Sequence, residues 1–320
     1  MGATADCTRH YAHVEGTELH WIEVGAGRPM VLLHGLADCH RTWRRLIPAL
    51  ADRRRLLMPD LAGHGLSARP DASYSLEWHA SLVGAWMDRL GLDEVDLVGH
   101  SYGGGVAQWL VLQRASRIRR LGLVAPGGLG RGVGIGVRLA TLGIVEKFGQ
   151  PFMGLGTSIG LRAAGMFERD DIDHVRWMNT APGTARALRR TAADVVDLKG
   201  QRIHMLEHAH EVAEMPPTLL FWGDRDPIIP FEQAERMRAS FDGVSLVRFE
   251  GVGHFPHLER PDEMANAMRD FVDEAALCRP KLRRPLLVAG GIDKPGKVKR
   301  FLRAVGNGIR RIIGMQRLAA

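Results

Sequence analysis

One serine stands in a setting that could make it a nucleophile. Ser101 lies in the segment Gly-His-Ser-Tyr-Gly, between a strand-like run at 94–98 and a helix-like run at 106–110. At such a sharp strand-to-helix turn, Gly99 and Gly103 remove side chains that would clash. The serine hydroxyl is then left exposed above the edge of a sheet. We therefore predict Ser101 as a nucleophile.

A serine hydroxyl needs a base at neutral pH, and the base needs an acid to orient it. After a turn of this kind the expected chain order is serine, acid, histidine. Two later strand-like runs, 217–222 and 244–249, are each followed by a loop. The first loop contains Asp224 and Asp226, and the second contains His254. Both loops leave the carboxyl ends of strands, where open α/β sheets place their chemistry.

Five stretches in this order resemble the serine hydrolases of the α/β-hydrolase fold, esterase- or lipase-like and with a cap. Together they cover roughly residues 15 to 275, and they are 34–38, 60–67, the serine turn, 222–227 and 253–261. The resemblance implies that Asp226, two residues after Gly-Asp, is the acid. It implies that His254, in the pattern Gly-His-x-x-x-x-Glu-x-Pro, is the base.

The same resemblance implies an α/β-hydrolase fold, with a mostly parallel, doubly wound, eight-stranded sheet. We expect residues 1–128 to form the first part of this core and residues 216–277 the second. Residues 129–215 should form a helical cap inserted between them, because no strand-like run interrupts this stretch. Residues 278–320 should form a basic tail that includes an amphipathic helix.

Attack on an ester carbonyl places negative charge on oxygen, which preorganised N–H groups stabilise. The resemblance assigns this oxyanion hole to the backbone N–H groups of Leu36 and Tyr102. We interpret the histidines of these motifs as hydrogen-bonding scaffold. The residues expected to support the turn and the oxyanion loop are His34, Gly35, Gly99, His100 and Gly103.

Simpler interpretations compete with several of these assignments. Ser101 could be a structural turn residue, and Asp224 could be the acid in place of Asp226. Asp226 is favoured by its motif position, because an aspartate at 224 also suits the cap of a turn. His257 could replace His254, but His254 directly follows the glycine of the motif.

No cofactor or metal is expected. Three histidines, His204, His208 and His210, lie close together on a helix-like stretch, but no H-E-x-x-H pattern or suitably spaced Cys or carboxylate accompanies them. We therefore favour an ordinary packed or solvated helix there. The glycines at 127–136 lack the spacing of a dinucleotide-binding fingerprint.

The favoured reaction is hydrolysis of a carboxylic ester or lipid-like substrate through an acyl-enzyme. A serine at 101 argues against epoxide hydrolases and haloalkane dehalogenases, which carry aspartate there. Carbon–carbon bond hydrolases usually carry Trp after the histidine, where this chain has Phe255. Carbon–carbon cleavage, acyl transfer, perhydrolysis and ligand binding without turnover remain alternatives.

Composition suits a globular enzyme of 320 residues, with 45% hydrophobic and 25% charged residues. Three widely spaced cysteines fit a reducing compartment. There is no signal-peptide pattern at the N-terminus and no apolar run long enough for a membrane span. We therefore expect a cytoplasmic protein, with peripheral association with a membrane as an alternative. The sequence leaves the oligomeric state open.

Apolar side chains are frequent in the predicted cap, and we expect most of them to pack inside it. The residues considered are Leu139, Ile144, Phe148, Phe152, Met153, Leu155, Met166, Phe167, Trp177 and Met178. Any that are not needed for packing are candidates for lining a substrate pocket.

The tail carries the basic character of the chain. Residues 276–320 contain twelve Lys and Arg against one acid, Asp293, while the whole chain has a net charge of +7. After Pro295, apolar and basic residues recur at helical spacing, interrupted by two glycines. Residues 296–320 therefore suit an anionic membrane surface, or docking on this chain or a partner. Nucleic acid is the weakest of these partners, because no recognition motif accompanies the charge.

Overall fold

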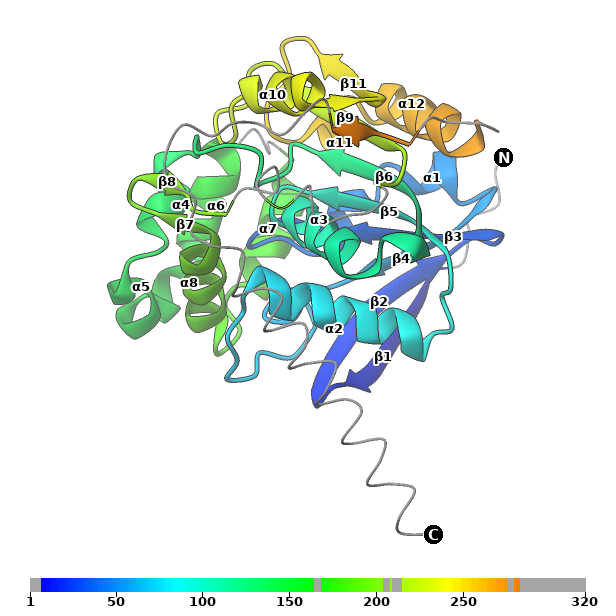
Figure 1. Ribbon diagram of the computed structural model, residues 1–320. Helices are drawn as coiled ribbons and strands as arrows, with labels where there is room; N and C mark the ends of the chain where they lie inside the picture. Colours follow the sequence, from blue (N-terminus) through cyan, green and yellow to red (C-terminus); the bar gives the residue numbers. More distant parts are fainter. Residues whose placement is uncertain (1–6, 164–167, 204–207, 209–214, 275–278, 283–320) are drawn as a thin grey trace, which may run out of the picture. The chain divides into compact units, whose positions relative to one another are not determined.

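The computed structural model describes residues 7–163, 168–203, 208, 215–274 and 279–282. The chain divides into residues 1–284 and 285–320, and every described residue belongs to the first unit. Its centre is an eight-stranded sheet (Figure 1). In spatial order the strands are β1 (Thr8–Val14), β2 (Thr17–Val24), β4 (Arg54–Pro59), β3 (Arg28–Leu33), β5 (Val95–His100), β6 (Ile118–Val124), β9 (Thr218–Gly223) and β11 (Val244–Phe249).

The predicted eight-stranded, mostly parallel sheet is confirmed. Strands β1 and β2 form an antiparallel hairpin, and β2 also runs antiparallel to β4. All the other pairings in this sheet are parallel. Strands β5 and β9 are buried at every position, because helices cover both faces of a parallel sheet.

Helices pack on the two faces of the sheet (Figure 1). Helices α2 (Leu76–Arg89), α3 (Tyr102–Arg114) and α10 (Glu232–Ser240) contribute to one apolar core. Helices α1 (Ile47–Leu50) and α12 (Pro261–Asp273) contribute to the second core. Shorter elements are η1 (His40–Trp43), η2 (Ala115–Arg117), α11 (Pro256–Glu259), and the paired strands β10 (Phe241–Asp242) and β12 (Lys281–Leu282).

The described chain between β6 and β9 is largely helical, and its elements lie within the predicted cap, residues 129–215. Its elements are α4 (Ile135–Leu139), α5 (Gly143–Phe148), η3 (Gln150–Phe152), α6 (Met153–Ala163), α7 (Arg169–Met178), α8 (Thr184–Val195), and a short hairpin of β7 (Val196–Asp197) and β8 (Gly200–Gln201). Leu161 of α6 and Val175 of α7 share a small core with Phe255 and Leu258. These helices therefore contact the loop that follows β11.

The expectation that most apolar residues of this region pack inside it is wrong. Half or more of the side chain is exposed at six of the ten, namely Leu139, Ile144, Phe148, Phe152, Leu155 and Trp177. Met153 and Met178 are buried, and Met166 and Phe167 lie outside the described residues. The reason is visible in α6, whose buried side includes Gly154, Thr157 and Ser158. Small and polar residues there take the inner positions.

Two other predictions fall mainly on residues outside the described part of the chain. These are the amphipathic helix of 296–320 and the group of three histidines. Of the three histidines, His208 alone is described. Its ring centre lies 5.5 Å from that of Trp109. Within the described residues, no helix has the length and hydropathy required to span a bilayer.

Candidate active site

Ser101 occupies a strained turn between β5 and α3. Its φ is 52° and its ψ is −115°, a conformation that L residues rarely adopt and that costs free energy. A Cβ atom at Gly99 would overlap the carbonyl oxygen of Gly103, and one at Gly103 would overlap that of His34. The Ser101 N–H donates to the Val124 carbonyl oxygen at 2.9 Å, which ties the turn to β6. The two glycines therefore allow the close approach that this turn requires.

His254 and Asp226 meet at the same edge of the sheet. The Nδ1 atom of His254 lies 2.7 Å from Oδ2 of Asp226. The other carboxylate oxygen, Oδ1, accepts from the N–H groups of Ile228 and Ile229 at 2.7 and 2.9 Å. With its Nδ1 proton directed to the carboxylate, the His254 ring keeps Nε2 free to act as a base.

The two competing residues have other partners. Asp224 forms an ion pair with Arg248 at 2.8 Å and accepts from the Gly251 N–H at 2.8 Å. These hydrogen bonds lower the pKa of Asp224. His257 is buried, with Nε2 2.8 Å from the hydroxyl of Thr42, and burial lowers its pKa to about 3. Both residues thus stabilise the loops beside the His254–Asp226 pair.

The loop that carries His254 is held from both sides. Glu259 accepts from the Gly253 N–H at 3.0 Å, which explains the glutamate of the motif. His100, next to Ser101, has Nε2 2.9 Å from the His254 carbonyl oxygen. Burial and the neighbouring histidines lower the pKa of His100 well below its ordinary value. A neutral His100 therefore donates one hydrogen bond that links the serine turn to the histidine loop.

The expected oxyanion loop follows β3. His34 lies with Nδ1 2.8 Å from the Gly35 carbonyl oxygen, and its Nε2 accepts from the Leu61 N–H at 2.9 Å. Burial lowers the pKa of His34, so it acts as a neutral scaffold. Ala37 has a φ of 60°. Its carbonyl oxygen accepts from Nδ2 of Asn179, at the end of α7, at 2.7 Å.

Tyr102 begins α3, where the first N–H groups of a helix have no acceptor within it. Its hydroxyl lies 2.9 Å from Nδ1 of His79, and His79 Nε2 lies 3.0 Å from the Ala62 carbonyl oxygen. Because the carbonyl can only accept, His79 donates from Nε2 and Tyr102 donates to Nδ1. Burial lowers the pKa of His79 to about 4. These two hydrogen bonds hold the first turn of α3 in place.

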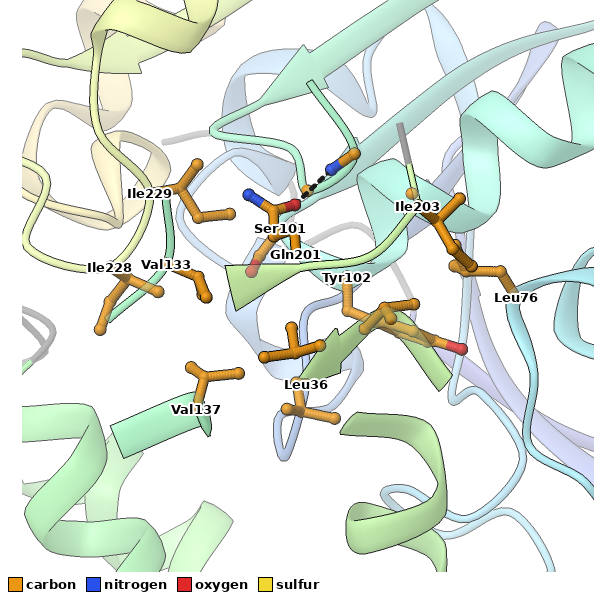
Figure 2. A pocket seen from close by; sticks show the side chains of 15 residues that line it. Leu36, Leu76, Ser101, Tyr102, Val133, Val137, Gln201, Ile203, Ile228 and Ile229 are labelled. Carbon is orange, nitrogen blue, oxygen red and sulfur yellow. Dashed lines mark hydrogen bonds between the residues drawn. The ribbon is translucent and has the colours of Figure 1, made fainter. Parts of the chain in front are cut away.

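A pocket opens beside Ser101, and aliphatic side chains form most of its wall (Figure 2). Leu36 and Tyr102 line it, together with Val133 and Val137 from the predicted cap. None of its lining residues in the described part of the chain is charged.

Among the described lining residues, Gln201 has a polar side chain, as do Ser101 and Tyr102. Its Oε1 accepts from the Gly128 N–H at 2.6 Å, and its Nε2 donates to the Gly132 carbonyl oxygen at 2.8 Å. Both the carbonyl oxygen and the NH2 group of this amide are therefore hydrogen-bonded within the protein. Neither Gln201 nor His79 nor Asn179 belongs to a motif in the sequence, so sequence analysis missed all three.

The donor atoms of one group of side chains are close enough together to bind a metal ion. Donor atoms of His20, His40 and Asp60 lie within 4.8 Å of one another. Asp60 already accepts from His20 at 2.8 Å, from His40 at 3.0 Å and from the Leu66 N–H at 2.9 Å. Burial tends to raise the pKa of Asp60, but the two histidine hydrogen bonds outweigh it and lower the pKa. The satisfied carboxylate fits a structural role in the loop after β4.

Comparison with known proteins agrees with this geometry. Residues 30–267 match the alpha/beta hydrolase family. The chain belongs to the α/β-hydrolase family. An uncharacterized protein of Mycobacterium tuberculosis is 31% identical over 303 residues, which cover 89% of this chain and 87% of that protein.

Two further α/β-hydrolase relatives have named activities. A 2-hydroxy-6-oxo-2,4-heptadienoate hydrolase of Pseudomonas putida is 30% identical over 275 residues, covering 80% of this chain and 93% of the relative. The structure of a 2-hydroxy-6-oxo-6-phenylhexa-2,4-dienoate hydrolase from Rhodococcus sp. strain RHA1 has a TM-score of 0.71 at 19% identity. It covers 85% of this chain and 100% of its own. At that identity the structural likeness shows the shared α/β-hydrolase fold.

Proposed function

We propose that this α/β-hydrolase cleaves carboxylic esters with an uncharged, apolar group next to the scissile bond. One observation supports the proposal most directly: the hydrogen-bonded His254–Asp226 pair and the strained Ser101 lie at one sheet edge, beside a pocket whose described lining residues carry no charge. An acyl-enzyme mechanism needs a nucleophile, a base and an oriented acid, and these residue types fit those roles.

In the proposed mechanism the Ser101 hydroxyl attacks the ester carbonyl while His254 Nε2 takes its proton. Asp226 orients the imidazole and stabilises its protonated form. The N–H groups of Leu36 and Tyr102 stabilise the oxyanion of the tetrahedral intermediate. Collapse expels the alcohol, which His254 protonates, and leaves the acyl group on Ser101. Water, activated by His254, then attacks the acyl-enzyme and releases the acid. No cofactor or metal takes part.

Cleavage of a carbon–carbon bond is the second candidate, because the Pseudomonas putida relative is named as a heptadienoate hydrolase. A dienoate is a carboxylate, and burying an unpaired carboxylate is costly. Among the described lining residues of the pocket there is no Lys, Arg or His to pair with it. Phe255 also stands where carbon–carbon bond hydrolases usually carry Trp. Both observations favour the ester.

The test compares two nitrophenyl esters of the same chain length. 4-Nitrophenyl hexanoate is neutral, whereas the mono-4-nitrophenyl ester of adipic acid ends in a carboxylate. We expect kcat/KM for the hexanoate to exceed that for the adipate by about a hundredfold or more, given the cost of burying the charge. Preference for the adipate would contradict the proposed uncharged group next to the scissile bond. Turnover of a 2-hydroxy-6-oxo-dienoate but of neither ester would favour carbon–carbon cleavage instead.

A further inference from the structure

The outer side of helices α4 to α6 is unusually apolar. Six large side chains between residues 135 and 159 are each more than half exposed. They are Ile135, Ile144, Phe148, Phe152, Leu155 and Ile159, and we refer to them as the α4–α6 face. Scattered exposed apolar residues need no explanation, but a concentration of this kind marks an interaction surface.

Helix α6 shows that packing within the protein does not account for this surface. Met153, Thr157 and Leu161 are on its buried side, whereas Leu155 and Ile159, four residues apart, are on its exposed side. In a helix of a globular protein the outward side is ordinarily polar. The apolar residues on the outward side of α6 therefore suit contact with something outside the described chain.

The α4–α6 face is also close to the substrate pocket. Helix α4 presents Val137 to the pocket, while its Ile135 is 68% exposed. One helix, about 10 Å across, thus separates the apolar pocket from the apolar outer surface. Figure 1 shows α4, α5 and α6 grouped together at one side of the sheet.

The segment that carries the face has more cations than acids. Residues 129–163 contain four cations and one acid, Glu146. Glu146 is paired with Arg189 and Arg190, at 3.5 and 3.1 Å. The exposed Lys147 lies with its ammonium 5.2 Å from the ring centre of Phe148. Cations placed beside exposed aromatic and aliphatic side chains are typical of a surface that lies in a membrane interface.

We propose that the α4–α6 face docks on a lipid surface that contains anionic headgroups. A symmetric pair of copies would bring the net positive segment 129–163 against its own copy, which like-charge repulsion disfavours. The basic tail, with twelve cations against one acid in residues 276–320, has the same sign of charge and is disfavoured for the same reason. Anionic lipid satisfies both the apolar side chains and the cations.

The test is flotation of the full chain with vesicles of phosphatidylcholine alone or with about one third phosphatidylglycerol, in which acidic lipid adds attraction for basic residues. The double variant Phe148→Ser/Phe152→Ser should lower the partition coefficient on the anionic vesicles at least about tenfold. Leu198→Ser is the matched control, because Leu198 is 59% exposed but lies outside the face. Its partitioning should equal that of the unaltered chain. Hydrolysis of a soluble ester should be the same in all three proteins.

Two further measurements test the role of the cations and the alternative that the face binds a second copy. Lys147→Glu/Arg162→Glu should weaken binding to the anionic vesicles and leave binding to phosphatidylcholine unchanged. Sedimentation velocity without lipid detects self-association. Unchanged partitioning of the double phenylalanine variant, or an equal loss in Leu198→Ser, would overturn the proposal. A dimer that the double phenylalanine variant dissociates would assign the face to a second copy.

Discussion

Asp224 and Asp226 lie two residues apart, yet their partners differ completely. Asp226 contacts His254 and two backbone N–H groups, whereas Asp224 pairs with Arg248. Motif position alone favoured Asp226 in the sequence. The hydrogen bonds give a physical reason for the same choice, since an acid must touch the base it orients. The 2.7 Å contact with His254 Nδ1 therefore distinguishes Asp226 from Asp224 as the proposed acid.

Buried histidines should make the stability of the fold depend on pH. The pKa of His79 is about 4 in the folded chain, against about 6.5 in an unfolded one. The unfolded state therefore binds more protons between these values, and the free energy of unfolding falls as the pH falls through this window. One such group changes it by up to about 1.4 kcal/mol for each pH unit.

Urea unfolding of the unaltered chain and of His79→Gln at pH 7 and pH 5 measures this contribution. The variant should be less stable at pH 7, because its hydrogen bonds with Tyr102 and Ala62 are altered, but it should lose less stability on going to pH 5. Asp38 titrates in the opposite sense, since burial raises its pKa to about 7. It is present in both proteins, so its effect cancels in the comparison. An equal loss in the two proteins would contradict this assignment.

At the scale of elements, the strands and the loops after them could be predicted because each motif is continuous in sequence. The helices between β6 and β9 could be expected as a group, but the side that each would bury could not. Small residues occupy the inner side of α6, so its apolar pattern points outward. Asn179 was missed for a different reason. Its contact with Ala37 joins residues 142 positions apart, and no local pattern records such a contact.

Asn179 should affect turnover through the oxyanion loop. Asn179→Leu removes the hydrogen bond to the Ala37 carbonyl oxygen, next to the proposed donor Leu36. We expect kcat to fall about tenfold or more with little change in KM, because a displaced donor weakens the transition state alone. Gln150→Leu is the matched control. Its amide also bonds to backbone groups in this region, at Ala181 and Ala185, but away from the loop. An equal fall of kcat in both variants would reduce Asn179 to a general structural role.

For the molecule as a whole, the proposed catalytic residues and the pocket come from distant parts of one chain. Residues after β3, β5, β9 and β11 meet at the carboxyl edge of the sheet, and residues from the region between β6 and β9 complete the pocket wall. The sequence predicted the sheet edge through its motifs. It could not predict the pocket, because Val133, Val137 and Gln201 have no pattern that distinguishes them from neighbouring residues. That the described lining residues carry no charge is therefore seen only in the folded structure.

The most direct measurement of the central claim is phosphonylation with a neutral phosphonate diester, ethyl 4-nitrophenyl hexylphosphonate, followed by intact mass and peptide mapping. We expect one adduct per chain on Ser101, with release of one nitrophenolate. Ser101→Ala should form no adduct, Asp226→Asn should react more slowly by up to about ten thousandfold, and Asp224→Asn should react at nearly the unaltered rate. A folded, unaltered chain that forms no adduct, or an adduct that persists in Ser101→Ala, would contradict the proposed nucleophile.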